Sequence, residues 1–206
     1  MTGRTCRAGL LVALPAVVAC GPQAAGPRGS TAEQAATLPD LGYGGDFELV
    51  GADGRPFRLS RVRDRIVLLF FGYTSCPDVC PTTLGTIARV KQTLGADGGR
   101  ILPVFVTVDP DRDTPDELAR YLAHFDIGAV GLTGAKAEID AVAGLFRVRY
   151  RIETSDSAMG PLISHTAYVF LVDRRGRVRH RFHPNEPAEA LAAVLRPVVG
   201  DPRLLE

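Results

Sequence analysis

The sequence has almost no charge imbalance, few cysteines and no apolar run long enough to cross a membrane. Its 206 residues carry a formal net charge of +1 and contain no basic run, so nothing in the composition indicates nucleic-acid binding. The leading apolar stretch, residues 8–18, is shorter than the roughly 20 residues that a membrane-spanning helix needs. Of four cysteines, only Cys76 and Cys80 follow residue 20, so any thiol chemistry beyond that point depends on this pair.

The N-terminal segment has the pattern of a bacterial export signal. Arg4 and Arg7 precede the apolar stretch, and Val17-Val18-Ala19-Cys20 resembles the lipobox of bacterial lipoproteins. We therefore expect residues 1–20 to be a lipoprotein signal peptide and Cys20 to become the lipidated first residue. The protein would then be anchored to a membrane of the bacterial cell envelope with its domain on the periplasmic side. An uncleaved membrane anchor is the alternative.

The rest of the chain divides into a tether and one domain. Residues 21–41 are rich in Gly, Pro, Ala and Gln, which is typical of a flexible tether. Residues 42–201 are numerous enough to form a single domain with its own hydrophobic core.

The most informative motif is Gly72-Tyr73-Thr74-Ser75-Cys76-Pro77-Asp78-Val79-Cys80-Pro81. It follows the apolar run 66–71, which predicts a buried strand, and Pro81 favours the start of a helix, with Cys80 as its N-cap. Unpaired N–H groups at a helix N-terminus favour thiolates over thiols, so we expect both cysteines to be activated. Such a pair can close a disulfide or jointly hold a soft metal ion. A purely structural disulfide is a weaker explanation, because so small a loop removes little chain entropy.

The order of the remaining elements predicts an α/β fold, an open sheet with helices on both faces. Crossover helices make the strands at 66–71 and 101–108 parallel, so Cys76 and Asp109 leave the same sheet edge. An antiparallel strand at 165–172 would bring His165 to that edge. The other expected strands are an N-terminal hairpin at 47–50 and 57–59 and a strand at 178–182. Helices are expected at 81–94, from Thr114 onward, around 139–146 and around 191–198. The helix from Thr114 has the clearest start, with Thr114, Pro115 and Glu117 as its capping residues.

The donor set of this edge suits copper. Thiolates are soft ligands that select Cu(I), and one added imidazole gives a three-coordinate set that also accepts Cu(II). Zinc is the rival metal, but a structural zinc site usually has a fourth protein ligand and none is obvious. The other histidines are His124, in an expected helix, and His180 and His183, which are three apart on a strand and so on opposite faces.

Several aspartates lie near the expected site. Asp78 lies between the two cysteines, and we expect it to act as a turn former. Asp109, Asp111 and Asp113 stand among Pro110, Thr114 and Pro115, a setting that favours turn and capping roles over a second metal site.

Three blocks of the sequence resemble the Sco/SenC family: Phe71–Pro81, Val108–Pro115 and Ser164–Asp173. The resemblance implies a thioredoxin-like fold and a membrane-anchored copper chaperone that delivers copper to the dinuclear copper centre of cytochrome c oxidase. It also implies that Cys76, Cys80 and His165 are the copper ligands. One departure is Ser164, since family members often have Asp immediately before the ligand histidine. An outer-shell carboxylate can orient an imidazole, so the partner of His165 is left open.

The sequence therefore predicts a metal-transfer protein and not a turnover enzyme. Its implied partner is a copper-receiving subunit of a respiratory oxidase, and the copper donor is not identified. The main alternative is a thiol–disulfide oxidoreductase that reduces the recipient's cysteines and cycles through a Cys76–Cys80 disulfide. A peroxide-reducing thiol enzyme is a second alternative, but no arginine can be placed beside a peroxidatic cysteine.

Overall fold

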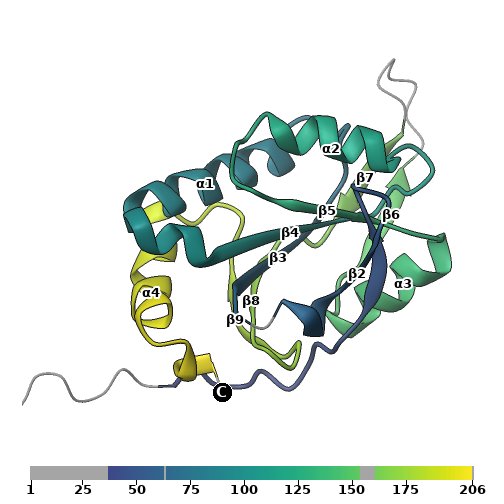
Figure 1. Cartoon of the computed structure of the whole chain (residues 1–206). Helices are drawn as coiled ribbons and strands as arrows, with labels where there is room; N and C mark the ends of the chain where they lie inside the picture. The colour runs from purple at the N-terminus through teal and green to yellow at the C-terminus, as the bar shows by residue number, and fades with distance from the viewer. Residues whose placement is uncertain (1–36, 63, 154–160, 206) are drawn as a thin grey trace, which may run out of the picture. The chain divides into compact units, whose positions relative to one another are not determined.

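The computed structural model describes residues 37–62, 64–153 and 161–205 (Figure 1). Its centre is a pair of parallel strands, β3 (Ile66–Gly72) and β4 (Ile101–Thr107), in which every residue is buried. Both strands are almost continuously apolar, as expected for strands covered on both faces. The signal peptide at 1–20, Cys20 and most of the expected tether lie outside the described residues.

Seven strands form one mixed sheet in the order β2-β1-β5-β4-β3-β8-β9. The strands β3, β4 and β5 are parallel, and the remaining neighbours pair antiparallel. The expected N-terminal hairpin is present as the first two strands. The further strands are β1 (Glu48–Gly51), β2 (Pro56–Arg58), β5 (Val130–Thr133), β8 (Val169–Val172) and β9 (Val178–Phe182).

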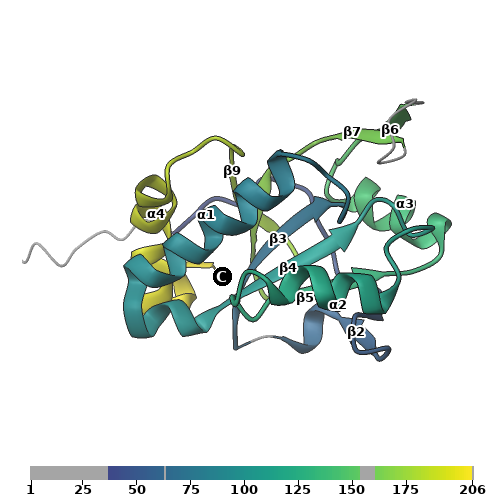
Figure 2. The same ribbon diagram turned by 90° about the horizontal axis from the view of Figure 1, so that it is seen from above.

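Helices cover both faces of this sheet, which confirms the expected thioredoxin-like α/β arrangement (Figures 1 and 2). The crossovers from β3 to β4 and from β4 to β5 step in the same direction, so right-handed connections put α1 and α2 on one face. Helix α4 packs beside α1, and α3 lies on the opposite face. The helices are α1 (Val79–Leu94), α2 (Pro115–Ala123), α3 (Lys136–Leu145) and α4 (Ala188–Gly200), with short 3-10 turns at Leu59–Arg61, Gly95–Arg100 and Pro202–Leu205.

Aromatic side chains fill the core on both sides of β3. Phe70 faces α2, because its ring lies 5.8 Å from that of Phe105, which in turn lies 6.0 Å from Tyr121. Phe71 faces the other way and lies 5.9 Å from Phe146 at the end of α3. Adjacent strand residues point to opposite faces, so two consecutive phenylalanines anchor the two helical layers to the same strand.

The prediction of a single strand at 165–172 is wrong. The structure has two strands there: β7 (Leu162–His165), which pairs with β6 (Tyr150–Glu153) in a separate two-stranded sheet, and β8 in the main sheet. Between them the backbone leaves the strand, and the N–H of Thr166 donates to the carbonyl of Arg149 at 2.9 Å. His165 therefore ends a small accessory sheet and does not begin a core strand.

The sequence predicted no strand at β5, a run of only four residues that includes Gly131. The glycine has a packing reason: a Cβ built there would lie 2.8 Å from the side chain of Leu122 in α2. The capping prediction at α2 is partly confirmed, since Thr114 Oγ1 accepts from the N–H of Glu117 at 3.3 Å. The Glu117 carboxylate bonds instead to Arg120.

The two ends of the described chain meet at the sheet edge formed by β9. The N–H of Leu38 donates to the carbonyl of Leu204 at 3.1 Å, and that of Leu41 donates to Val178 at 2.9 Å. Residues 38 and 41, which fall in the expected tether, thus hydrogen-bond to the domain. Among the described residues, no helix is both long and apolar enough to cross a membrane.

Candidate metal centre

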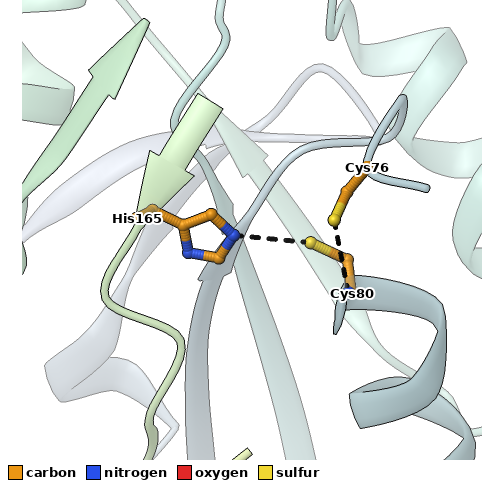
Figure 3. A group of neighbouring side chains, drawn as sticks. All are labelled: Cys76, Cys80 and His165. Atoms are coloured by element: carbon orange, nitrogen blue, oxygen red, sulfur yellow. Dashed lines mark hydrogen bonds between the residues drawn. The ribbon is translucent and has the colours of Figure 1, made fainter. Parts of the chain in front are cut away.

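The two cysteines lie at the turn between β3 and α1 (Figure 3). Cys80 is fully buried and Cys76 is half-buried, and both are free thiols. The expected N-cap is wrong by two residues, because α1 begins at Val79 with Asp78 in the N-cap position. The backbone N–H of Cys80 is therefore a helix N-terminal donor, and it points to Cys76 Sγ at 3.5 Å.

His165 reaches the cysteines from the end of β7. Its Nε2 lies 3.7 Å from Cys80 Sγ, and its Nδ1 lies 3.2 Å from the carbonyl oxygen of Thr166 (Figure 3). A carbonyl can only accept a hydrogen bond, so Nδ1 carries the proton and the lone pair of Nε2 faces the thiols. The Thr166 carbonyl thus orients the imidazole. The sequence had left this orienting partner open, because Ser164 stands where family members often have Asp.

The three side chains form a group that could hold a metal ion. Cys76, Cys80 and His165 each offer one ligand atom, and these atoms all lie within 4.8 Å of one another. Within the described ranges, this is the one group of three or more such side chains close enough for a metal. The structure therefore brings together the residues that the sequence predicted as ligands.

Aromatic rings enclose the imidazole. The ring of Tyr73 lies 6.0 Å from that of His165 and the ring of Phe70 lies 6.2 Å away, both edge-on. The hydroxyl oxygen of Tyr73 also accepts from the N–H of Ile163 in β7 at 3.2 Å. Tyr73 thereby ties the histidine strand to the cysteine turn, a contact that the sequence did not indicate.

The two thiols have opposite acidities. The Cys80 thiol donates toward Cys76, and this contact together with the backbone N–H groups of Asp78 and Cys80 lowers the pKa of Cys76 to about 3, against the opposing effect of burial. The neighbouring Cys76 sulfur and burial raise the pKa of Cys80. The expectation of two activated thiolates is therefore wrong: at neutral pH the pair holds one thiolate and one proton. Binding of a metal by both sulfurs must release that proton.

The aspartates divide into two kinds. Asp78 and Asp111 are exposed, and the side chain of Asp78 makes no capping bond. Asp109 is buried and pairs with Arg112. The expectation of a turn or capping role is wrong for Asp113, which is fully buried and bonds to Thr74 and Thr107 beneath the cysteine turn.

The remaining histidines lie outside the group. His124 bonds to the carbonyl of Tyr121 at 3.2 Å. His180 lies on β9, where burial lowers its pKa. The ring of His183 packs against Tyr168 with centroids 5.4 Å apart.

Because Gly72 has no side chain, the Cys80 thiol can occupy the space beside it. A Cβ built on Gly72 would lie 2.9 Å from Cys80 Sγ and 2.9 Å from the ring of Phe105. We expect Gly72→Ala to destabilise the fold by about 1–3 kcal/mol and to displace the Cys80 sulfur. Urea unfolding measures the first effect and copper affinity the second.

Gly85 provides the matched control for this substitution. It lies inside α1 with nothing within 4 Å of a built Cβ, so Gly85→Ala should stabilise the protein by up to about 1 kcal/mol. Equal stability of the two variants would contradict the packing argument.

Taken together, the fold and the site define a class: a thioredoxin-like protein with two thiols and one imidazole at the carboxyl edge of its central parallel strands. The chain matches the SCO1/SenC family over residues 35–200 and belongs to that family.

Relatives and solved structures agree with this membership. An SCO2-like protein of Rickettsia conorii is 37% identical over 150 residues, which cover 72% of this chain and 73% of the relative. The structure of Bradyrhizobium japonicum ScoI with copper bound has 37% identity and a TM-score of 0.68, covering 75% of this chain and 98% of that one. Apo Sco1 from Thermus thermophilus has 35% identity and a TM-score of 0.69, covering 81% and 99%.

Proposed function

We propose that this protein is a membrane-anchored copper chaperone that delivers copper to the dinuclear copper centre of cytochrome c oxidase, with Cys76, Cys80 and His165 as the copper ligands. The observation that carries the proposal is the convergence of two thiols and an oriented imidazole, with all ligand atoms within 4.8 Å. This donor set fits copper, because thiolates favour Cu(I) and the imidazole extends the set to Cu(II). The copper-bound ScoI relative supports the same choice.

The site is open on one side, which suits transfer. A hollow of about 340 Å³ is lined by Cys76 and His165 but not by Cys80, which lies fully buried behind them. A recipient's sulfur or nitrogen donor can enter this hollow and replace one exposed ligand at a time. Cys80 would hold the metal until last, so copper would pass by ligand exchange without release into solvent.

Transfer to a recipient is the test of this proposal. Copper-loaded protein mixed with the metal-free copper-binding domain of an oxidase subunit should lose its copper to that domain, which gains the absorption of its own centre. Size-exclusion chromatography followed by metal analysis of each fraction measures the exchange. Copper that stays on the chaperone, or reaches the recipient equally fast from a small-molecule copper complex, would contradict a delivery role.

A second candidate function is reduction of the recipient's cysteines, favoured by the low pKa of Cys76. The Cys76 thiolate would attack the partner's disulfide and displace one partner thiolate. Cys80 would then lose its proton and attack the Cys76 sulfur, displacing the second partner thiolate and leaving a Cys76–Cys80 disulfide. Two electrons pass to the partner in this sequence. However, so acidic a thiol is a weaker nucleophile, which limits the rate.

We further propose that cleavage before Cys20 removes the lipoprotein signal peptide and that Cys20, then the first residue of the mature chain, carries lipid. A tether beginning at residue 21 would follow and would join the copper-binding domain near Leu38, where hydrogen bonds to the domain begin. Acyl chains at Cys20 would hold the domain at the periplasmic side of the cell envelope, since more than one chain gives stable anchoring. Mass spectrometry of the mature N-terminus should find a diacylated or triacylated Cys20. A chain that still begins at Met1, or an unmodified Cys20, would contradict the anchor.

A further inference from the structure

The segment Asp109–Asp113, which links β4 to α2, contacts both halves of the metal centre. At its end Asp113 is fully buried, and its carboxylate accepts three hydrogen bonds. The donors are the N–H of Thr74 at 3.0 Å, the hydroxyl of Thr74 at 2.5 Å and the hydroxyl of Thr107 at 2.6 Å. Thr74 stands two residues before Cys76. Asp113 therefore holds the first half of the cysteine turn through both the backbone and the side chain of Thr74.

The preceding residue contacts the histidine half. Arg112 Nη2 donates to the carbonyl of Pro161 at 3.0 Å, immediately before β7 begins at Leu162. Its guanidinium also lies 5.9 Å from the centre of the Tyr73 ring, and Tyr73 in turn accepts from the N–H of Ile163. Asp109 pairs with Arg112 and orients it. Arg112 therefore holds the residue that leads into β7, the strand that ends at His165.

The segment is itself held firmly. The N–H of Asp113 donates to the carbonyl of Asp109 at 2.9 Å, and the N–H of Asp109 donates to Thr107 Oγ1 at 2.9 Å. Directly after it, Thr114 caps α2. Both ends of the segment are thus fixed, one to β4 through Thr107 and the other to the start of α2.

We propose that Asp109–Asp113 is the positioning element of the metal centre: Asp113 sets the cysteine turn, and Arg112 sets the strand that carries His165. The inference rests on the proposed copper-binding function for its metal readout, but its thiol readout is independent of copper. Ligand side chains held by fixed neighbours lose less freedom when they bind a metal, so the two residues raise affinity without touching the ion.

The first experiment is done without metal. In glutathione redox buffers, Asp113→Ala should shift the Cys76–Cys80 pair toward the disulfide by about tenfold, or about 30 mV for a two-electron couple. We expect this shift because the three bonds to Asp113 hold the turn in the conformation that carries two free thiols. Asp113→Asn keeps the shape and one carbonyl acceptor, so it should restore most of the wild-type equilibrium.

The second experiment separates the two halves. Arg112→Gln should leave the dithiol–disulfide equilibrium within about twofold of the wild type but lower Cu(II) affinity by about tenfold, the lower range for loss of an outer-shell partner. It should also change the thiolate-to-Cu(II) absorption band, because the imidazole is displaced. Asp111→Asn is the matched control, since Asp111 lies in the same segment with an exposed side chain, and it should change neither quantity.

Thermal unfolding of each variant separates positioning from stability. The proposal is overturned if Asp113→Ala matches Asp111→Asn in both the thiol equilibrium and Cu(II) affinity, whatever its melting temperature. It is also overturned if Arg112→Gln leaves Cu(II) binding and its spectrum unchanged. Should Asp113→Ala not fold, a wild-type thiol equilibrium in Thr74→Val, which removes the hydroxyl bond to Asp113, would overturn it as well. If the wild type itself binds no copper, the copper function fails, while the metal-free equilibrium still decides the role of Asp113.

Discussion

Protein in which Cys76 and Cys80 are joined by a disulfide should bind almost no copper, whereas the reduced protein should bind one ion per chain. The disulfide consumes two of the three ligand atoms that the structure brings within 4.8 Å, and a lone imidazole at His165 is a weak site for either oxidation state. Metal analysis after gel filtration of fully oxidised and fully reduced samples gives the two stoichiometries.

The control for this result is the oxidised sample reduced again in the absence of air, which should recover the full stoichiometry. Recovery excludes damage to the protein as the cause of the loss. Equal copper binding by oxidised and reduced protein would show that the thiols are not ligands, and the proposed centre would then be wrong. Loading should also release protons, because Cys80, whose pKa is raised, must lose its hydrogen to bind.

Replacing His165 by alanine should lower Cu(II) affinity by at least about 100-fold, since even loss of an outer-shell partner costs 10–100-fold. Cu(I) affinity should fall much less, because the two thiolates are its preferred ligands. The fold should be unaffected, as His165 ends a two-stranded sheet outside the main core. Competition titrations with chelators of known affinity, run for each oxidation state, measure the two effects.

His183→Ala is the matched control, because His183 is exposed, packs on Tyr168 and lies outside the ligand group. It should leave both affinities unchanged. Disulfide-reduction rates measured on the same samples separate the two proposed functions. Unchanged Cu(II) binding in His165→Ala would return His165 to a structural role at the end of β7. A large loss of reduction rate with copper binding intact would favour the oxidoreductase.

The sequence predicted the parts of the fold that have strong local signals. The apolar run at 66–71, the strand at 101–108 and the Thr114–Pro115 helix start all correspond to elements of the structure, because burial on both faces and helix capping leave direct traces in residue order. The ligand set came from the Cys76–Cys80 spacing, the chain topology and the resemblance to the Sco/SenC family. The structure places these residues together with His165. However, His165 lies at the end of the accessory strand β7 and not at the start of a strand of the main sheet.

What the sequence did not reveal depends on contacts between distant segments. Asp113 looked like a turn residue because Pro110 and Pro115 surround it, yet its partner Thr74 is 39 positions away. The orienting partner of His165 is a backbone carbonyl, and every residue type supplies one. The accessory strands β6 and β7 are four residues each, and only Ile163 among their side chains is buried, so burial leaves little trace of them in the sequence.

The separation of the small β6–β7 sheet from the seven-stranded sheet bears on how such a centre can arise. The thiols belong to the core fold, at the turn after β3, while the imidazole is supplied by an appendage that shares no strand pairing with the main sheet. A dithiol protein of this architecture can therefore acquire nitrogen ligation by inserting one short hairpin between α3 and β8, with every central pairing left intact. For protein engineers, the same insertion point is a place to exchange the third donor for another side chain without redesigning the scaffold.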